Sequence, residues 1–281
     1  MFEFKISTFS RVLVRGLLIL ILTFSLNSCK STNLSHEFEF VLDTGPEAMG
    51  TTESALDVAF FVSDVYLITA MGEKFPLQLS SNNWQVDNAA LIILGNDATG
   101  TYNNIISGST PALNASKDTF NKLEFTLGLP AHLNHSNPLT AKPPLNTSSM
   151  FWSWQLGYKF LRIDSRSETL SWSFHLGSTN CSSPSPIRPP TAPCEKPNRV
   201  NITLPLDNKS SSHIFVNVGA FSKHPIGKKT VSCTGQYSEN PICSTWLGEL
   251  GLNPSTGRCT ISCDEQALFY TTRESVKTSV Q

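Results

Sequence analysis

The chain has 281 residues, of which 40% are hydrophobic and 15% charged, and its formal net charge at pH 7 is −1. This balance leaves no basic excess of the kind that marks nucleic-acid-binding proteins, so we expect no nucleic-acid partner. The 17 Pro and 16 Gly residues divide the sequence into many short segments, which is typical of a fold built from short strands and turns.

The N-terminus has the organisation of a lipoprotein signal peptide. Basic residues precede the apolar run 16–26, and a basic stretch followed by a short apolar core is typical of a secretory signal. The run is too short for a transmembrane helix, which needs ~20 apolar residues. It ends in the sequence LNSC, which resembles the lipobox of bacterial lipoproteins. We therefore predict a signal peptide over residues 1–28, lipid attachment at Cys29 and a polar tether over residues 29–35.

This assignment predicts where the mature protein resides. An acylated cysteine contributes ~0.8 kcal/mol of membrane affinity per buried CH₂ group, so a multiply acylated Cys29 anchors the chain firmly. We expect the protein in the cell envelope, lipid-anchored to a membrane at the periplasmic or outer-membrane face.

Strand patterns begin directly after the tether. In residues 36–42 the side chains alternate, with His36, Phe38 and Phe40 on one face of the predicted strand. Further predicted strands are rich in β-branched and aromatic residues; they are residues 55–69, 74–79, 89–94 and 119–127.

The rest of the chain adds one helix and one long loop to this pattern. Residues 241–250 show a helical period, whereas residues 182–193 (SSPSPIRPPTAP) are too rich in proline for regular structure. Many short strands between turn residues predict an all-β, β-sandwich-like fold with long loops and a short C-terminal helix. We expect the folded domain over residues 36–268 and a tail over residues 269–281.

Six cysteines remain once Cys29 is assigned to lipid, and all of them lie at or after position 181. An even number of cysteines in an exported chain indicates disulfides. Pairing of sequence neighbours is the simplest arrangement, and it predicts a stapled C-terminal part with Cys181–Cys194, Cys233–Cys243 and Cys259–Cys263. A thiolate metal site is the alternative, although no two of these cysteines form a Cys-x-x-Cys pair.

Imidazole and indole side chains gather between residues 127 and 181. His132 and His135 lie in the segment LGLPAHLNH, and Trp152 and Trp154 lie in the segment FWSWQLGYKF. If that segment is a strand, the two indoles share a face. In the alternating segment 170–175, His175 points away from the apolar face and could meet a ligand together with the LNH loop.

These residues restrict the class of metal site without proving one. Imidazole suits Zn, Cu, Fe and Ni, whereas carboxylate-rich sites suit Ca and Mg. Paired cysteines would exclude a blue-copper centre, which needs a thiolate, and the few methionines exclude a methionine-rich Cu(I) carrier. From the residues alone, a histidine such as His135 or His175 is more often a hydrogen-bonded loop residue than a metal ligand, and paired tryptophans on a strand face are usually core or sugar-stacking residues.

Three spaced segments resemble the MbnP-like copper-binding family of methanobactin gene cassettes, in its branch with a Trp-x-Trp motif. They are LGLPAHLNH, PLNTSSMFWSWQLGYKF and HLGSTNC followed by CEKPNR. The segments FFVSDVYL and LGELGL extend the resemblance over most of residues 38–252.

The resemblance implies a single copper ion held by histidines and by a kynurenine formed from a tryptophan. It also implies a modifying partner, a dihaem cytochrome c peroxidase-like protein. By position, His135 and His175 are the implied ligands, with His132 a weaker third candidate, and Trp152 or Trp154 is the residue modified. More distant relatives carry a Trp-x-His motif in which the tryptophan is modified. This favours Trp152 as the modified residue here, and Trp154 then stands at the position where those relatives have a second ligand.

Two other classes of function compete with copper handling. A surface lipoprotein that binds carbohydrate or peptide would use exposed aromatic residues as stacking platforms; the candidates are Trp84, Trp152, Trp154 and Trp172. A hydrolase would need a nucleophile elbow, a Ser-His-Asp arrangement or a phosphate loop, and the sequence shows none of them. We therefore predict a binding protein and not an enzyme.

Overall fold

The computed structural model describes residues 33–45, 55–95, 100–111, 120–166, 171–206, 213–223, 230–235, 237–260 and 263–271. The predicted signal peptide, Cys29 and most of the tether lie outside the described residues. The chain divides into two units, Met1–Asn33 and Leu34–Gln281, and the fold below is that of the second unit. Within the ranges given above, no helix is long and apolar enough to cross a membrane.

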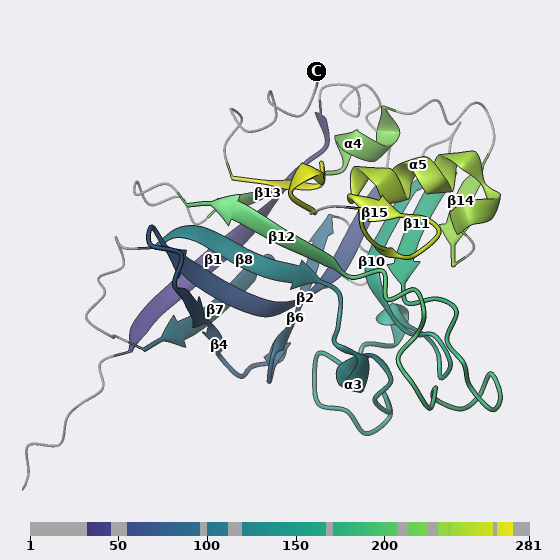
Figure 1. Cartoon of the computed structure of the whole chain (residues 1–281), viewed down its shortest axis with the longest axis horizontal. Helices are drawn as coiled ribbons and strands as arrows, with labels where there is room; N and C mark the ends of the chain where they lie inside the picture. Colours follow the sequence, from purple (N-terminus) through teal and green to yellow (C-terminus); the bar gives the residue numbers. More distant parts are fainter. Residues whose placement is uncertain are drawn as a thin grey trace, which may run out of the picture. The chain divides into compact units, whose positions relative to one another are not determined.

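Among the described residues of this unit, two large β-sheets form the main body and a two-stranded sheet is added to them (Figure 1). The smaller sheet has the order β17 (Phe269–Tyr270), β13 (His213–Asn217), β1 (Leu34–Asp43), β7 (Ile105–Thr110) and β4 (Gln78–Leu79). The path of the larger sheet is β12 (Val200–Pro205), β8 (Phe120–Leu127), β2 (Ala55–Thr69), β10 (Gly157–Arg166), β11 (Ser171–Gly177) and β14 (Val231–Thr234). Four short strands join it off this path: β3 (Lys74–Pro76), β5 (Gln85–Val86), β6 (Ala89–Gly95) and β9 (Phe151–Ser153).

Phenylalanine rings from both sheets meet in the core. Phe40 of β1 packs edge-on against Phe60 of β2 and Phe125 of β8, with ring centroids 5.3 and 6.1 Å apart. Phe269 of β17 contacts the same rings. All four side chains are buried, and edge-to-face pairs of this kind add ~0.5–1.5 kcal/mol beyond their burial. The apolar faces of the two sheets therefore enclose one core, which confirms the predicted all-β, sandwich-like class.

The strands expected from alternation and β-branched runs are confirmed, with one informative difference. The predicted single strand 74–79 is split at Leu77, and its two halves belong to different sheets. β3 pairs with β2, whereas β4 pairs with β7. Leu77 itself is buried and its N–H donates to the carbonyl of Val65 at 2.8 Å. A one-residue break thus carries the chain from one sheet to the other.

The C-terminal part packs a short helix against the larger sheet. Asn240 caps α5 (Pro241–Glu249), and its side chain accepts from the N–H of Ile242. Trp246 on α5 is fully buried against Trp172 of β11, with ring centroids 5.1 Å apart. The predicted helix is confirmed, and so are the three disulfides, Cys181–Cys194, Cys233–Cys243 and Cys259–Cys263.

Short elements complete the unit. They are the helices α3 (Ala131–Asn134) and α4 (Gly219–Ser222), the 3₁₀ turns η3 (Ser148–Met150), η4 (Tyr237–Glu239) and η5 (Cys263–Glu265), and the hairpin β15 (Leu252–Asn253) with β16 (Arg258–Cys259). β1 starts at Leu34, inside the predicted tether, and β17 brings residues of the predicted tail into the core, because Phe269 and Tyr270 pair with β13.

Candidate metal centre

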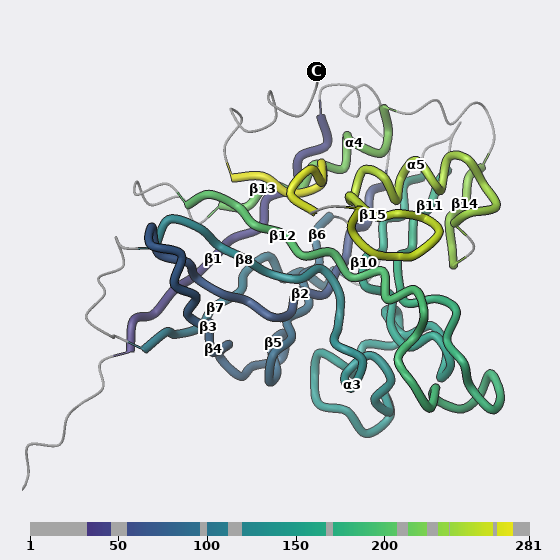
Figure 2. Tube along the Cα trace, viewed as in Figure 1, coloured from purple at the N-terminus to yellow at the C-terminus, as the bar shows by residue number. Residues whose placement is uncertain are grey.

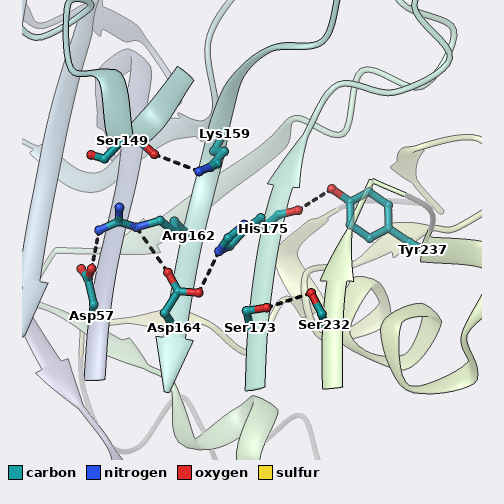
Figure 3. A network of polar contacts seen from close by, with 9 residues as sticks. All are labelled: Asp57, Ser149, Lys159, Arg162, Asp164, Ser173, His175, Ser232 and Tyr237. Atoms are coloured by element: carbon teal, nitrogen blue, oxygen red, sulfur yellow. Dashed lines mark hydrogen bonds and ion pairs between the residues drawn. The ribbon is translucent and has the colours of Figure 1, made fainter. Parts of the chain in front are cut away.

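His175 is held by a carboxylate on the neighbouring strand. It lies on β11, opposite Arg162 of β10 in the strand register, and its Nε2 is 2.9 Å from Oδ1 of Asp164 (Figure 3). An ionised carboxylate can only accept hydrogen bonds, so Nε2 of His175 carries the proton. When the ring is neutral, Nδ1 has the free lone pair and is the nitrogen able to bind a metal.

The surroundings of Asp164 keep it ionised. Burial alone would raise the pKa of Asp164, but the hydrogen bond from His175 and the charges of His175, Arg162 and Arg166 outweigh burial and lower it. Arg162 links this carboxylate to a second one, because its Nε lies 3.6 Å from Oδ2 of Asp164 and its Nη2 pairs with Asp57 (Figure 3). The result is a row of alternating charges across β2, β10 and β11 that ends on the imidazole.

Trp152 lies beside this imidazole. Its ring centroid is 6.5 Å from that of His175, in an edge-on arrangement. The indole crosses the end of β11 at Gly177, where an added Cβ would lie 3.0 Å from the indole and 2.8 Å from the carbonyl oxygen of Tyr158. Glycine at position 177 therefore allows the close approach of Trp152 to the strand that carries His175.

The two tryptophans of the FWSW segment do not share a strand face, so that prediction is wrong. β9 ends at Ser153, residues 154–156 form a turn, and Gly157 pairs with Ser153 in a hairpin. The Ser153 hydroxyl accepts from the N–H of Leu156, and Gly157 has a φ of +78°, a conformation that favours glycine. Trp154 consequently packs against Phe151, with ring centroids 5.7 Å apart.

The amide of Asn134 sets the protonation of His135. Oδ1 of Asn134 accepts from the backbone N–H of Tyr158 at 2.8 Å, so its Nδ2 is the donor that faces Nε2 of His135 at 3.1 Å. Nε2 of His135 must then be the unprotonated nitrogen. Burial lowers the pKa of His135, and the nearby backbone of Trp154 offsets only part of this lowering. The ring is thus neutral at neutral pH, as a metal ligand must be.

His135 also touches the Cys181–Cys194 disulfide. Its Nε2 is 3.5 Å from Sγ of Cys194. In the part of the chain that the structure describes, these three residues form the one group of three or more His, Cys, Asp or Glu side chains whose ligand atoms lie within 4.8 Å of one another. Because the two sulfurs are bonded to each other, this group offers one imidazole and no thiolate.

The predicted site residues therefore fall on two sides of one hairpin turn. The indole of Trp152 contacts His175, and the backbone of Trp154 lies beside His135. Asn134 joins the two sides, because its Nδ2 also lies 3.4 Å from Oγ of Ser178, directly after β11. Figure 2 shows the chain around α3 and the loop after β11 at the same end of the larger sheet.

Two other candidate residues, His36 and His213, lie on strands of the smaller sheet. His132 is exposed on α3. His36 is 2.9 Å from Oγ1 of Thr110, and His213 forms an exposed pair with Glu39, while His224 lies outside the described residues. Trp172 is buried against Trp246, so it cannot serve as the stacking platform considered for a carbohydrate-binding surface.

Sequence reasoning missed Asp164 and Asn134, the two residues that orient the imidazoles. Asp164 lies eleven positions before His175, and only the register of β10 against β11 makes them neighbours. Asn134 stood within the LNH segment, but its role depends on the position of Tyr158. The sequence offered one signal for Asn134, a polar residue directly before a histidine, and no comparable signal for Asp164.

This is a two-sheet β-domain that brings imidazole and indole side chains together at one sheet end. The family model of MbnP matches residues 28–242, and the chain belongs to this family. Among solved structures, MbnP from Methylosinus trichosporium matches with a TM-score of 0.69 and 21% sequence identity, over 85% of this chain and 98% of that one. No curated protein matches the sequence. Membership in this family associates the chain with methanobactin and with copper.

Proposed function

We propose that the chain is an exported lipoprotein, anchored through Cys29, that binds a single copper ion through His135, His175 and a kynurenine derived from Trp152. The single observation that carries this proposal is the edge-on contact between Trp152 and His175, whose ring is fixed by Asp164. In this proposal the protein serves copper acquisition or handling and is not an enzyme.

The donor set fits copper. A carboxylate that accepts from a metal-binding imidazole fixes the ring and raises its basicity, which is how Asp164 would act on His175. His135 is neutral, and its unprotonated nitrogen, Nε2, faces the amide of Asn134. Nitrogen sites of this kind bind Cu(II) more tightly than Zn(II). His132, exposed on α3, is a weaker third candidate.

Modification of Trp152 would supply the donor that two imidazoles lack. An indole N–H is a hydrogen-bond donor only. A dihaem cytochrome c peroxidase-like partner, with peroxide as the oxidant, would cleave the C2–C3 bond of the indole and place one oxygen atom on each of the two carbons, while two peroxides are reduced to water. Hydrolysis of the formyl group then releases formate and leaves an aromatic amine next to His175. Trp154, packed on Phe151, would hold the hairpin in place.

A pair of single substitutions tests this assignment. Trp152→Phe should abolish the kynurenine mass change, measured by tandem mass spectrometry of native material, and should weaken copper binding. Trp154→Phe, the matched control in the same hairpin, should leave the kynurenine on the peptide at position 152. Native copper-loaded protein with an intact indole at Trp152 would overturn the kynurenine assignment. Modification at Trp154 alone would move the site to the other side of the turn.

A further inference from the structure

We propose that reduction of the Cys181–Cys194 disulfide creates a second metal site, in which the two thiolates and Nε2 of His135 bind one soft d¹⁰ cation, Cu(I) first among them. This site shares His135 with the proposed histidine copper site, but it needs neither His175 nor Trp152. Its sulfur donors are absent from the oxidised protein, so the site exists only in the reduced state.

The spacing of the donor atoms fits a shared ion. In zinc proteins, metal–sulfur and metal–nitrogen distances are ~2.3 and ~2.0 Å, so neighbouring sulfur and nitrogen ligands of a tetrahedral site lie about 3.5 Å apart. Nε2 of His135 is 3.5 Å from Sγ of Cys194, and all three ligand atoms lie within 4.8 Å of one another. The lone pair of His135 is on this same nitrogen, because Asn134 donates to it at 3.1 Å, and the metal ion would take the place of that hydrogen bond.

The backbone holds the two cysteines together without their covalent bond. Thr179 and Lys196 form a two-way bridge, with N–H to carbonyl distances of 2.9 and 3.2 Å. The N–H of Glu195 also donates to the carbonyl of Asn180 at 3.2 Å. These bonds lie immediately outside the disulfide, so opening it does not release the two chain segments. After reduction the sulfurs separate from bonding distance while their backbones stay paired.

The redox step requires a dithiol reductant, such as an enzyme of the thioredoxin type. Two electrons and two protons from the dithiol convert Cys181–Cys194 into two thiols, and the reductant becomes a disulfide. Metal binding then displaces the thiol protons to solvent. The loop 182–193 that the disulfide closes has no helix or strand, and irregular surface segments open locally at low free-energy cost.

Soft thiolate ligands determine the class of cation. Thiolates select Cu(I) and Zn(II) over hard cations such as Mg²⁺ or Ca²⁺. In the oxidised protein the donors are nitrogens, which suit Cu(II). The proposal therefore links the redox state of one disulfide to the kind of metal that His135 binds.

Anaerobic Cu(I) titration tests the proposal. Copper-free protein is reduced with dithiothreitol, the reductant is removed, and alkylation with mass mapping verifies free thiols at Cys181 and Cys194. Competition with a chromophoric Cu(I) chelator should then show one Cu(I) per chain that the oxidised protein does not bind. Copper X-ray absorption of this reduced wild type should show sulfur ligands together with imidazole nitrogen, without reliance on any variant.

Matched variants separate this site from the others. The added Cu(I) should disappear in Cys181→Ser/Cys194→Ser and bind at least about tenfold more weakly in His135→Ala. It should persist in Cys259→Ser/Cys263→Ser, which removes a different disulfide, and in His175→Ala, which removes the proposed histidine copper site alone. A reduced protein that gains no Cu(I), a copper shell without sulfur, or a gain lost only with Cys259 and Cys263 would overturn the proposal.

Discussion

Asp164 offers the sharpest test of how the imidazole of His175 is prepared for a metal. The two side chains are joined by a 2.9 Å hydrogen bond and are largely shielded from water, with 20% and 15% of their side-chain surfaces exposed. Asp164→Asn keeps the shape and one acceptor oxygen but removes the negative charge, and Asp164→Ala removes both. Neither substitution alters a proposed copper ligand.

The size of the loss in copper affinity follows from the kind of contact that each substitution removes. A hydrogen bond to a charged group contributes ~1.5–3 kcal/mol, and loss of a carboxylate that orients a metal-binding histidine typically costs ~10–100-fold in affinity. That factor corresponds to about 1.4–2.8 kcal/mol, so the two estimates agree. We expect Asp164→Asn near the lower end of this range and Asp164→Ala near the upper end. Competition between the protein and a calibrated copper chelator measures both.

Asp57→Asn is the matched control for this experiment. Asp57 pairs with the same Arg162, on the side away from His175 (Figure 3). If Asp164 acts by orienting His175, Asp57→Asn leaves copper affinity within about twofold of the wild type, well short of the tenfold loss expected for a residue that orients the ligand. Equal losses in the two variants would mean that the charge row acts as a whole, and an unchanged affinity in Asp164→Ala would refute the orienting role.

Three further predictions concern stability and anchoring. Phe40→Ala should lower the free energy of unfolding by ~3–5 kcal/mol in denaturant titration, because the ring is buried where both sheets meet; a loss below about 1 kcal/mol would mean that the rings do not form a shared core. Because the pKa of Asp164 in the folded state is lowered from 3.8, its stabilising contribution is present above that pH and lost as the pH falls through the folded-state pKa. The difference in unfolding free energy between wild type and Asp164→Asn should therefore shrink in acid, and a difference that grows there would contradict the sign. Cys29→Ala should prevent incorporation of labelled lipid and leave the protein unprocessed or soluble; normal labelling would exclude acylation at Cys29.

Local patterns predicted the strands that make up most of the core. The alternation in β1 and the long β-branched run of β2 were sufficient to predict these two strands, because each strand buries one or both of its faces. The strands β7, β12, β13 and β14 were not predicted. Two of them, β13 and β14, pair in parallel with strands distant in sequence, β1 and β11 respectively. Parallel pairing depends on the chain path between the strands, which no local pattern records.

The candidate site was predicted in composition but not in geometry. FWSWQLGYKF alternates as a strand does, yet Ser153 and Gly157 turn it into a hairpin, so turn chemistry overrode the period. The histidines were visible in the sequence, whereas their hydrogen-bond partners depend on strand register. The prediction of the three disulfides was correct because each bond joins two cysteines that follow one another along the chain.

Copper stoichiometry of the native lipoprotein, purified from a copper-replete host, tests the central claim most directly. The wild type should carry one copper ion per chain, and the double variant His135→Ala/His175→Ala should carry none. His213→Ala, which removes an exposed imidazole paired with Glu39 on another sheet, should keep the full complement. An undiminished copper content in the double variant would contradict the account and place the ligands elsewhere in the chain.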